Sequence, residues 1–245
     1  MNSGFSERTF EFCFNAEFCQ LFSGLLASHP HIPSQRIEKD LGYDVEFALA
    51  GGGFSASVFL QHKTAYFAES RAGRNSAFFD HQGGPYFRFP VDKDQHNTLH
   101  ELSLTKGNAF YCAPQFHLRN ELETHFRAAT IAFNSMLLDP ADVGTIDDDE
   151  RHNITYKPNG ENSTLHSNPK RFQKSHRINN QQQPHFKPQK IDKSYVENLG
   201  EELEKRTVNS KFKNAVTPAV KHLKPVEKAQ YLLGHVYEVS WILIP

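Results

Sequence analysis

Four polar residues have types and spacing that suit metal-dependent hydrolysis: Asp44, Gln61, His62 and Lys63. Magnesium and manganese prefer oxygen ligands, which the Asp44 carboxylate, the Gln61 amide and the backbone carbonyl of His62 would supply. The Lys63 amine would orient or deprotonate an attacking water, or stabilise charge on a phosphorane. The combination suits hydrolysis of a phosphodiester. The alternative is the polar, solvated face of an ordinary hairpin, where Asp and Lys are common.

These side chains meet only if residues 42–63 form a β-hairpin. Two alternating apolar and polar stretches flank the glycine run 51–53, a pattern typical of a hairpin turn. A turn centred between Gly52 and Gly53 would place Asp44 opposite Gln61, with their Cβ atoms about 5 Å apart. On the first strand, alternation puts one set of apolar side chains on the face opposite Asp44 and Glu46. That set is Tyr43, Val45, Phe47 and Leu49.

A helix is predicted before this hairpin. Apolar residues recur at steps of three and four over residues 6–27, and Ser6 is a suitable N-cap. The helix carries three glutamates, at Glu7, Glu11 and Glu17. A connection over 28–41 then leads into the first strand, and the second strand is expected to continue from Lys63 to Phe67.

A crossover helix and a buried strand are predicted after the hairpin. The helix covers 95–106, with Leu99, Leu102 and Leu104 facing inward and Gly107 at its end. The apolar run 108–116 lacks alternation, as expected for a buried parallel strand. Together with the hairpin they predict an α/β domain with a mixed sheet. The other expected elements are a long irregular excursion (69–93), a helix (118–129), strands (130–138 and 147–156) and three helices (195–207, 210–222 and 226–243).

The totals limit the class of protein. The chain has 245 residues, 38% of them hydrophobic, and no apolar run approaches the roughly 20 residues that span a bilayer. We see no secretory signal at the N-terminus. The three cysteines, Cys13, Cys19 and Cys112, have no metal-binding spacing, so we expect reduced core residues in a cytoplasmic protein.

Charge is distributed unevenly in the second half. Residues 139–150 contain six acids and no Lys or Arg, whereas residues 151–193 contain nine Lys or Arg against two acids. Within this basic tract, Lys170, Arg171, Lys174 and Arg177 are interleaved with aromatic residues, which suits contact with nucleic acid. The alternative is a solvated, flexible loop.

The spacing of Asp44 from Gln61-His62-Lys63 resembles the D…QxK variant of the PD-(D/E)XK nuclease superfamily. The expected order of elements is similar to the αβββαβ core of that superfamily, as in restriction endonucleases. The sequence around the motif also resembles bacterial restriction-like proteins, over about residues 6–116. Gln61 replaces the usual glutamate of the ExK triplet, which weakens one ligand.

The resemblance implies a Mg²⁺- or Mn²⁺-dependent deoxyribonuclease of bacterial restriction or anti-phage defence. In such enzymes a glutamate of the first helix often completes the site, for which Glu17 is our first choice and Glu11 the second. Glu38, just before the first strand, is a further assisting residue. His96, on the crossover helix, would contact DNA if that helix flanks the site.

We therefore expect a nuclease-like α/β core over 1–156, a basic flexible segment over 157–193 and a helical part over 194–245. The helical part would cover the sheet, form a homodimer contact or bind a partner subunit. Two alternatives to the nuclease remain: an inactive nuclease-fold protein that binds nucleic acid, and an interaction subunit of a defence complex.

Overall fold

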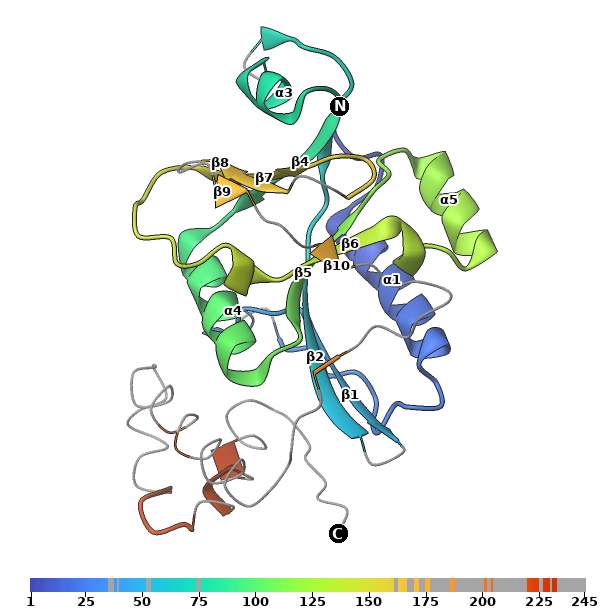
Figure 1. The fold of residues 1–245 in the computed structure, drawn as a ribbon. Coiled ribbons are helices and arrows are strands. Elements are labelled where there is room, and N and C mark those ends of the chain that lie inside the picture. Colours follow the sequence, from blue (N-terminus) through green and yellow to red (C-terminus); the bar gives the residue numbers. More distant parts are fainter. Residues whose placement is uncertain are drawn as a thin grey trace.

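Two β-sheets with helices around them form the described part of the chain (Figure 1). The computed structural model describes residues 1–34, 38, 40–51, 54–73, 76–160, 163–166, 170, 171, 175, 176, 186, 187, 201, 204, 220–224, 227–229, 231 and 232. The first sheet has the strand order β1-β2-β5-β6-β10, and the second has the order β3-β4-β7-β8-β9. The helices are α1 (Glu7–Leu21), α3 (Ser76–Gln82), α4 (Lys93–Lys106) and α5 (Arg119–Ala128), with short 3-10 turns η2 (Ala132–Asn134) and η3 (Pro140–Asp142). The strands are β1 (Val45–Gly51), β2 (Phe54–His62), β3 (Tyr66–Ala68), β4 (Tyr86–Val91), β5 (Ala109–Pro114), β6 (Ser135–Leu138), β7 (His152–Tyr156), β8 (Thr164–His166), β9 (Lys170–Arg171) and β10 (Ser175–His176).

The predicted hairpin and its register are confirmed. Strands β1 and β2 are antiparallel, with Val45 paired to Leu60 and Gly51 paired to Phe54. One residue beyond these pairs, Asp44 faces Gln61, as the turn position predicted. Tyr43 departs from the predicted face, because it precedes the strand and its ring packs 5.1 Å from that of Phe59.

Helix α1 begins at the predicted N-cap but is shorter than expected. The Ser6 hydroxyl accepts a hydrogen bond from the Thr9 backbone N–H at 3.1 Å. The helix ends at Leu21 rather than near residue 27. The chain after it lies along β1 instead, where Leu26 pairs with Leu49. Backbone pairing to an open sheet edge thus replaces the last helical turn.

Strand β5 is the buried parallel strand that the sequence predicted. It pairs in parallel with β2, from Phe59 with Ala109 to His62 with Cys112, and all six of its residues are buried. Helices α1 and α5 lie on one face of this first sheet and α4 lies on the other (Figure 1). Leu99 and Leu102 of α4 are buried as expected, but Leu104 is 66% exposed.

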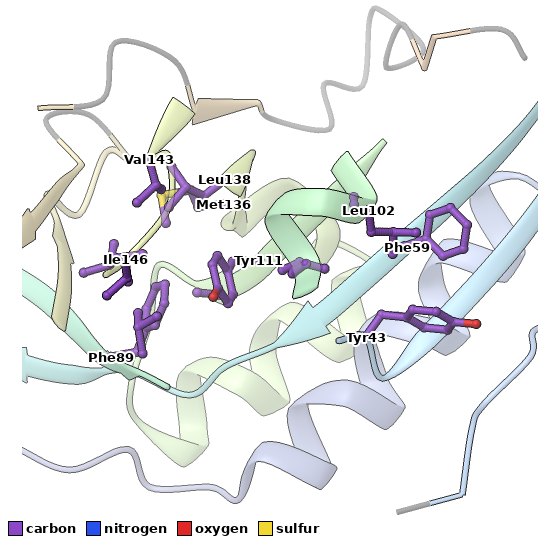
Figure 2. Close-up of a cluster of buried hydrophobic side chains, with 14 of the residues drawn as sticks. Tyr43, Phe59, Phe89, Leu102, Tyr111, Met136, Leu138, Val143 and Ile146 are labelled. Atoms are coloured by element: carbon purple, nitrogen blue, oxygen red, sulfur yellow. The ribbon is translucent and has the colours of Figure 1, made fainter. Parts of the chain in front are cut away.

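A large apolar cluster fills the space between the first sheet, α4 and the second sheet (Figure 2). Tyr111 of β5, Leu102 of α4 and Phe89 of β4 belong to it. Val220 and Leu232 of the C-terminal part are also buried in this cluster, and Ala229 is buried as well. The inward direction predicted for Ala229 and Leu232 therefore holds, while most of 194–245 lies outside the described residues.

The second sheet is the main difference from the predicted fold. The strand expected to run on to Phe67 is interrupted over Lys63–Ala65, and β3 pairs with β4 instead. The stretch 69–93, expected to be irregular, contains α3 and β4. The third strand of the expected αβββαβ core thus belongs to a different sheet, and the described fold is a mixed α/β structure with two sheets.

The basic tract contains short strands where it is described. Strands β8 and β9 extend the second sheet, and β10 pairs with β6 of the first. Residues Lys174 and Arg177, and most of 177–193, lie outside the described residues. Among the described helices, none combines the length and apolar character needed to cross a membrane. All three cysteines are free, and Cys13 and Cys112 are buried.

Candidate active site

The Asp44 carboxylate is the centre of the polar cluster at the open end of the hairpin. It is buried, and its two oxygens accept hydrogen bonds from both predicted neighbours on β2. The Gln61 side chain donates Nε2–H to Oδ1 at 2.8 Å, and the His62 backbone N–H donates to Oδ2 at 2.5 Å. The register of the hairpin therefore brings Asp44 opposite β2, where hydrogen bonds from Gln61 and His62 hold its carboxylate in place.

The oxygen of the Gln61 amide has no hydrogen-bond partner among the described residues, although it is fully buried. Buried polar atoms are normally satisfied, since an unmet acceptor costs its whole desolvation energy. The amide that carries this oxygen is hydrogen-bonded through its nitrogen to one Asp44 oxygen, and the other Asp44 oxygen accepts the His62 backbone N–H. Because both backbone groups of a strand residue face the same side, the His62 carbonyl points the same way as its N–H. These oxygens fit the preference of Mg²⁺ or Mn²⁺.

Two glutamates, Glu38 and Glu11, interact electrostatically with the Asp44 carboxylate. Burial, and then the neighbouring charge of Asp44 and a hydrogen bond to it, raise the pKa of Glu38 to about 7. Burial also raises the pKa of Glu11, and the charge of Asp44 raises it further. Burial alone would raise the pKa of Asp44, but the hydrogen bonds and charge of His62 and the hydrogen bond from Glu38 lower it overall. Asp44 is thus the ionised member, and Glu38 holds the shared proton below about pH 7.

Lys63 reaches this cluster from the end of β2 and is oriented by the crossover helix. Its backbone N–H bonds to the Cys112 carbonyl of β5 at 2.9 Å. Its Nζ donates to the Gln95 side-chain oxygen at 3.0 Å. The charge of Lys63 acts to lower the pKa of Glu38, against the larger effect of burial. Gln95 was missed in the sequence, because nothing in a helical pattern marks which residue of its first turn meets a distant lysine.

The His62 side chain lies on the other face of the sheet. Its ring is fully buried between the rings of Phe10 and Phe14, at centroid distances of 5.9 and 5.6 Å. Its Nδ1 is 3.6 Å from the nearer Asp44 oxygen. Only the backbone of His62 therefore faces the side of Gln61, as the alternation of a strand requires.

Glu17, the first choice from the helix, lies elsewhere. Its carboxylate accepts the backbone N–H groups of Ile131 and Ala132 at 2.8 and 3.0 Å, and so it joins α1 to η2. Glu11 and Glu17 are six residues apart, which puts them on different faces of a helix that turns about 100° per residue. The local sequence does not rank Glu11 above Glu17, because each is next to a buried phenylalanine, Phe10 or Phe18.

Of the expected nucleic-acid contacts, the structure describes His96, Lys170 and Arg171. His96 is fully buried, with its ring nitrogens 3.0 Å from the Tyr111 hydroxyl and 2.8 Å from the Gly144 carbonyl. Burial lowers its pKa to about 4, so it is neutral at pH 7. Lys170 and Arg171 form β9 of the second sheet.

Within the described ranges, no three His, Cys, Asp or Glu side chains converge as a metal-binding group. A metal would therefore rely on Asp44 together with amide and carbonyl oxygens. Searches of protein-family models, of curated proteins and of solved structures found no match to this chain.

Proposed function

We propose that this protein is a metal-dependent endonuclease that hydrolyses DNA phosphodiester bonds, acting in bacterial restriction or anti-phage defence. The buried, unpartnered Gln61 oxygen beside the ionised Asp44 carboxylate carries this proposal. Asp44, Gln61 and the His62 carbonyl would hold Mg²⁺ or Mn²⁺. When bound, such an ion neutralises charge on the phosphate and acidifies a bound water.

The other residues of the cluster would handle the water and its proton. Lys63, oriented by Gln95, would hold the attacking water and offset charge as the phosphorus–oxygen bond forms. Glu38 is suited to accept the water proton, since its pKa of about 7 matches neutral solution. The bond to the leaving oxygen then breaks, and that oxygen takes a proton from solvent.

A plasmid-nicking assay with Mg²⁺ or Mn²⁺ tests the proposal. Wild type should nick, while Asp44→Ala and Lys63→Ala should each lose at least about a hundredfold in rate. Asp80→Ala and Lys221→Ala are matched controls, because they remove an exposed carboxylate and an exposed amine elsewhere. Cleavage that persists in both site variants would overturn the assignment.

The second candidate is a nuclease-fold protein that binds nucleic acid without cutting it. It is favoured by the presence of Gln61 where the superfamily motif has an acid, and by the lack of a three-residue metal group in the described chain. DNA that shifts in a gel but stays intact with either metal would support this candidate over the nuclease.

A further inference from the structure

An open cleft of about 920 Å³ lies at the start of α4, where Asp92, Lys93 and Asp94 line it. Tyr66 of β3, Arg88 of β4, Lys93 of α4 and the loop residues Asp149 and Arg151 line it. The residues of the candidate active site do not line this cleft, although the first turn of α4 contributes a residue to each.

The first turn of α4 connects the cleft to Lys63. Asp92, which also lines the cleft, caps the helix by accepting the Gln95 backbone N–H at 3.0 Å. The Gln95 side chain in turn binds the Lys63 amine. A chain of substrate that has one phosphate at Lys63 would therefore have its neighbouring phosphates near this cleft.

The cleft contains groups that recognise nucleotides. The Arg88 guanidinium lies over the Tyr66 ring, 5.1 Å from its centroid, and 5.5 Å from that of Phe78. Lys93 and Arg151 add two more cations. Cations bind phosphates, and aromatic rings with arginine offer stacking surfaces to bases.

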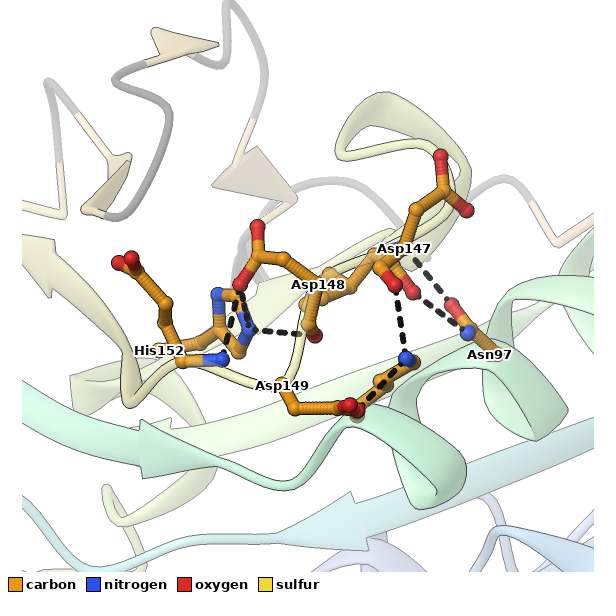
Figure 3. A network of polar contacts seen from close by, with 8 residues as sticks. Asn97, Asp147, Asp148, Asp149 and His152 are labelled. Atoms are coloured by element: carbon orange, nitrogen blue, oxygen red, sulfur yellow. Dashed lines mark hydrogen bonds and ion pairs between the residues drawn. The ribbon is translucent and has the colours of Figure 1, made fainter.

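Asp149 and Glu150, from the acidic segment Asp147-Asp148-Asp149-Glu150, line part of this cleft. Figure 3 shows the polar contacts of the segment. Lys93 donates to the Asp149 carboxylate at 2.8 Å and to the Asp147 carbonyl at 2.7 Å. The segment is anchored on one side by paired bonds between Asn97 and the backbone of Ile146, each 2.9 Å long. On the other side Asp148 faces the buried His152 ring at 3.1 Å.

The ion pair between Lys93 and Asp149 is exposed enough for another anion to replace the carboxylate. The Asp149 side chain is 94% exposed and that of Lys93 is 29% exposed. Ion pairs in such surroundings are weak, because water and salt screen both charges. A phosphate oxygen can take the place of the carboxylate on Lys93 with little loss, whereas the anchors at Asn97 and His152 would stay in place.

We propose that this cleft binds the phosphate backbone of DNA next to the bond that is cut, and that Asp149 occupies the phosphate position on Lys93 until DNA arrives. The inference rests on the proposed nuclease function, but it is tested by binding alone. Asp149 thereby lowers affinity for DNA, and Lys93 supplies a contact that raises it.

The test is fluorescence anisotropy of a labelled DNA oligonucleotide with the full chain in EDTA, where no cleavage occurs. Asp149→Asn should tighten Kd by roughly two- to fivefold, the range set by losing an exposed ion pair. Lys93→Gln should weaken binding and reduce the slope of log Kd against log salt by about one. The matched control is Glu123→Gln, which removes an exposed carboxylate that pairs with Arg127 on α5.

Lys93→Gln combined with Asp149→Asn should bind no more tightly than Lys93→Gln alone. Equal gains from Asp149→Asn and Glu123→Gln would overturn the proposal, since net charge would then account for both. An unchanged salt slope in Lys93→Gln would overturn it as well. Nicking without these effects would leave the nuclease standing and remove the cleft, whereas these effects without nicking would leave the cleft as a binding surface.

Discussion

The Asp44 carboxylate and the Gln61 amide show how two side chains on paired strands can form a site with no further element. One amide hydrogen satisfies the carboxylate, and the amide oxygen is left buried and unpartnered. The Glu38 carboxyl shares a proton with the same carboxylate. Charge in this cluster is therefore balanced by a proton near neutral pH, and a cation that displaces the proton would restore the balance.

Replacing Glu38 by Gln should raise stability by an amount that grows as pH rises from about 4.5 to about 7 and stays constant above that. The pKa of Glu38 rises from 4.5 to about 7 on folding, so the folded state binds more protons than the unfolded state between these values. The folded state is therefore favoured by the protonated Glu38 carboxyl at pH below 4.5, and this contribution is lost as pH rises to about 7. Glu38→Gln should thus raise Tm at pH 8 by about 2–4 °C, equivalent to about 1 kcal/mol after screening, and leave it unchanged at pH 4.5.

Thermal melts at both pH values measure this effect. Glu69→Gln, which removes an exposed carboxylate, is the control and should show no such pH dependence. An equal change in Tm at the two pH values would contradict a raised pKa at Glu38.

Replacing Gln61 by Glu should lower the stability of the metal-free protein and raise its affinity for a metal ion. The variant loses the hydrogen bond to Asp44 and gains a second carboxylate, so its metal-free stability should fall by about 1–3 kcal/mol. Mn²⁺ should then raise Tm more in the variant than in wild type, because a folded site with two carboxylates binds the ion more tightly. Differential scanning fluorimetry across a Mn²⁺ series checks this, and Asp44→Asn should show no rise.

Among the secondary-structure elements, helix α4 connects the candidate site to the rest of the fold. Its first turn carries Gln95 against Lys63, and its second holds His96 against Tyr111 of β5. The helix is therefore held on the sheet by a buried polar contact as well as by Leu99 and Leu102. A change within α4 would reach the lysine through Gln95 without any direct contact with metal or substrate.

Gln95 is a positioning residue in this arrangement. Gln95→Leu should free the Lys63 amine and reduce the nicking rate by roughly tenfold, with little change in DNA affinity. Acylation of Lys63 by an amine-reactive ester, followed by mass spectrometry, should be faster in the variant. This second measurement does not depend on cleavage. Equal labelling of Lys63 in variant and wild type would show that Gln95 does not restrain it.

Local patterns predicted the elements whose partners are close in sequence. The glycines of the turn and the alternation around Val45 and Leu60 determined the hairpin, its register and hence the pairing of Asp44 with Gln61. The second sheet was missed, because β3 has three residues and its partners come from later, separated segments. Glu11 was ranked below Glu17 for a similar reason, since only packing against the sheet shows which helix face meets the hairpin.

The two sheets are coupled at the scale of the whole molecule by buried side chains. The Tyr156 hydroxyl of β7 donates to the Pro114 carbonyl of β5 at 2.6 Å, and its ring stacks on Phe87 of β4. Tyr156 and Phe87 both belong to the apolar cluster shared with α4. The sheets should therefore unfold together rather than as separate units.

Tyr156→Phe should lower the free energy of unfolding by about 1–3 kcal/mol, because the Pro114 carbonyl then stays buried without its donor. Urea unfolding followed by far-UV circular dichroism and by the near-UV circular dichroism of the buried aromatic side chains should still give coincident transitions. Transitions that separate in wild type would contradict the coupling of the two sheets.

The pairing of β2 with β5 has a consequence for the order in which the chain folds. The hairpin that joins Asp44 to Gln61 is local and can form early, since short loops close fastest. The Lys63 backbone is held by the Cys112 carbonyl, so its anchor comes only after β3, α3, β4 and α4 have been made. On the ribosome, we expect Asp44 and Gln61 to be paired well before the Lys63 backbone is anchored, so a nascent chain would carry this pair while the lysine is still unrestrained.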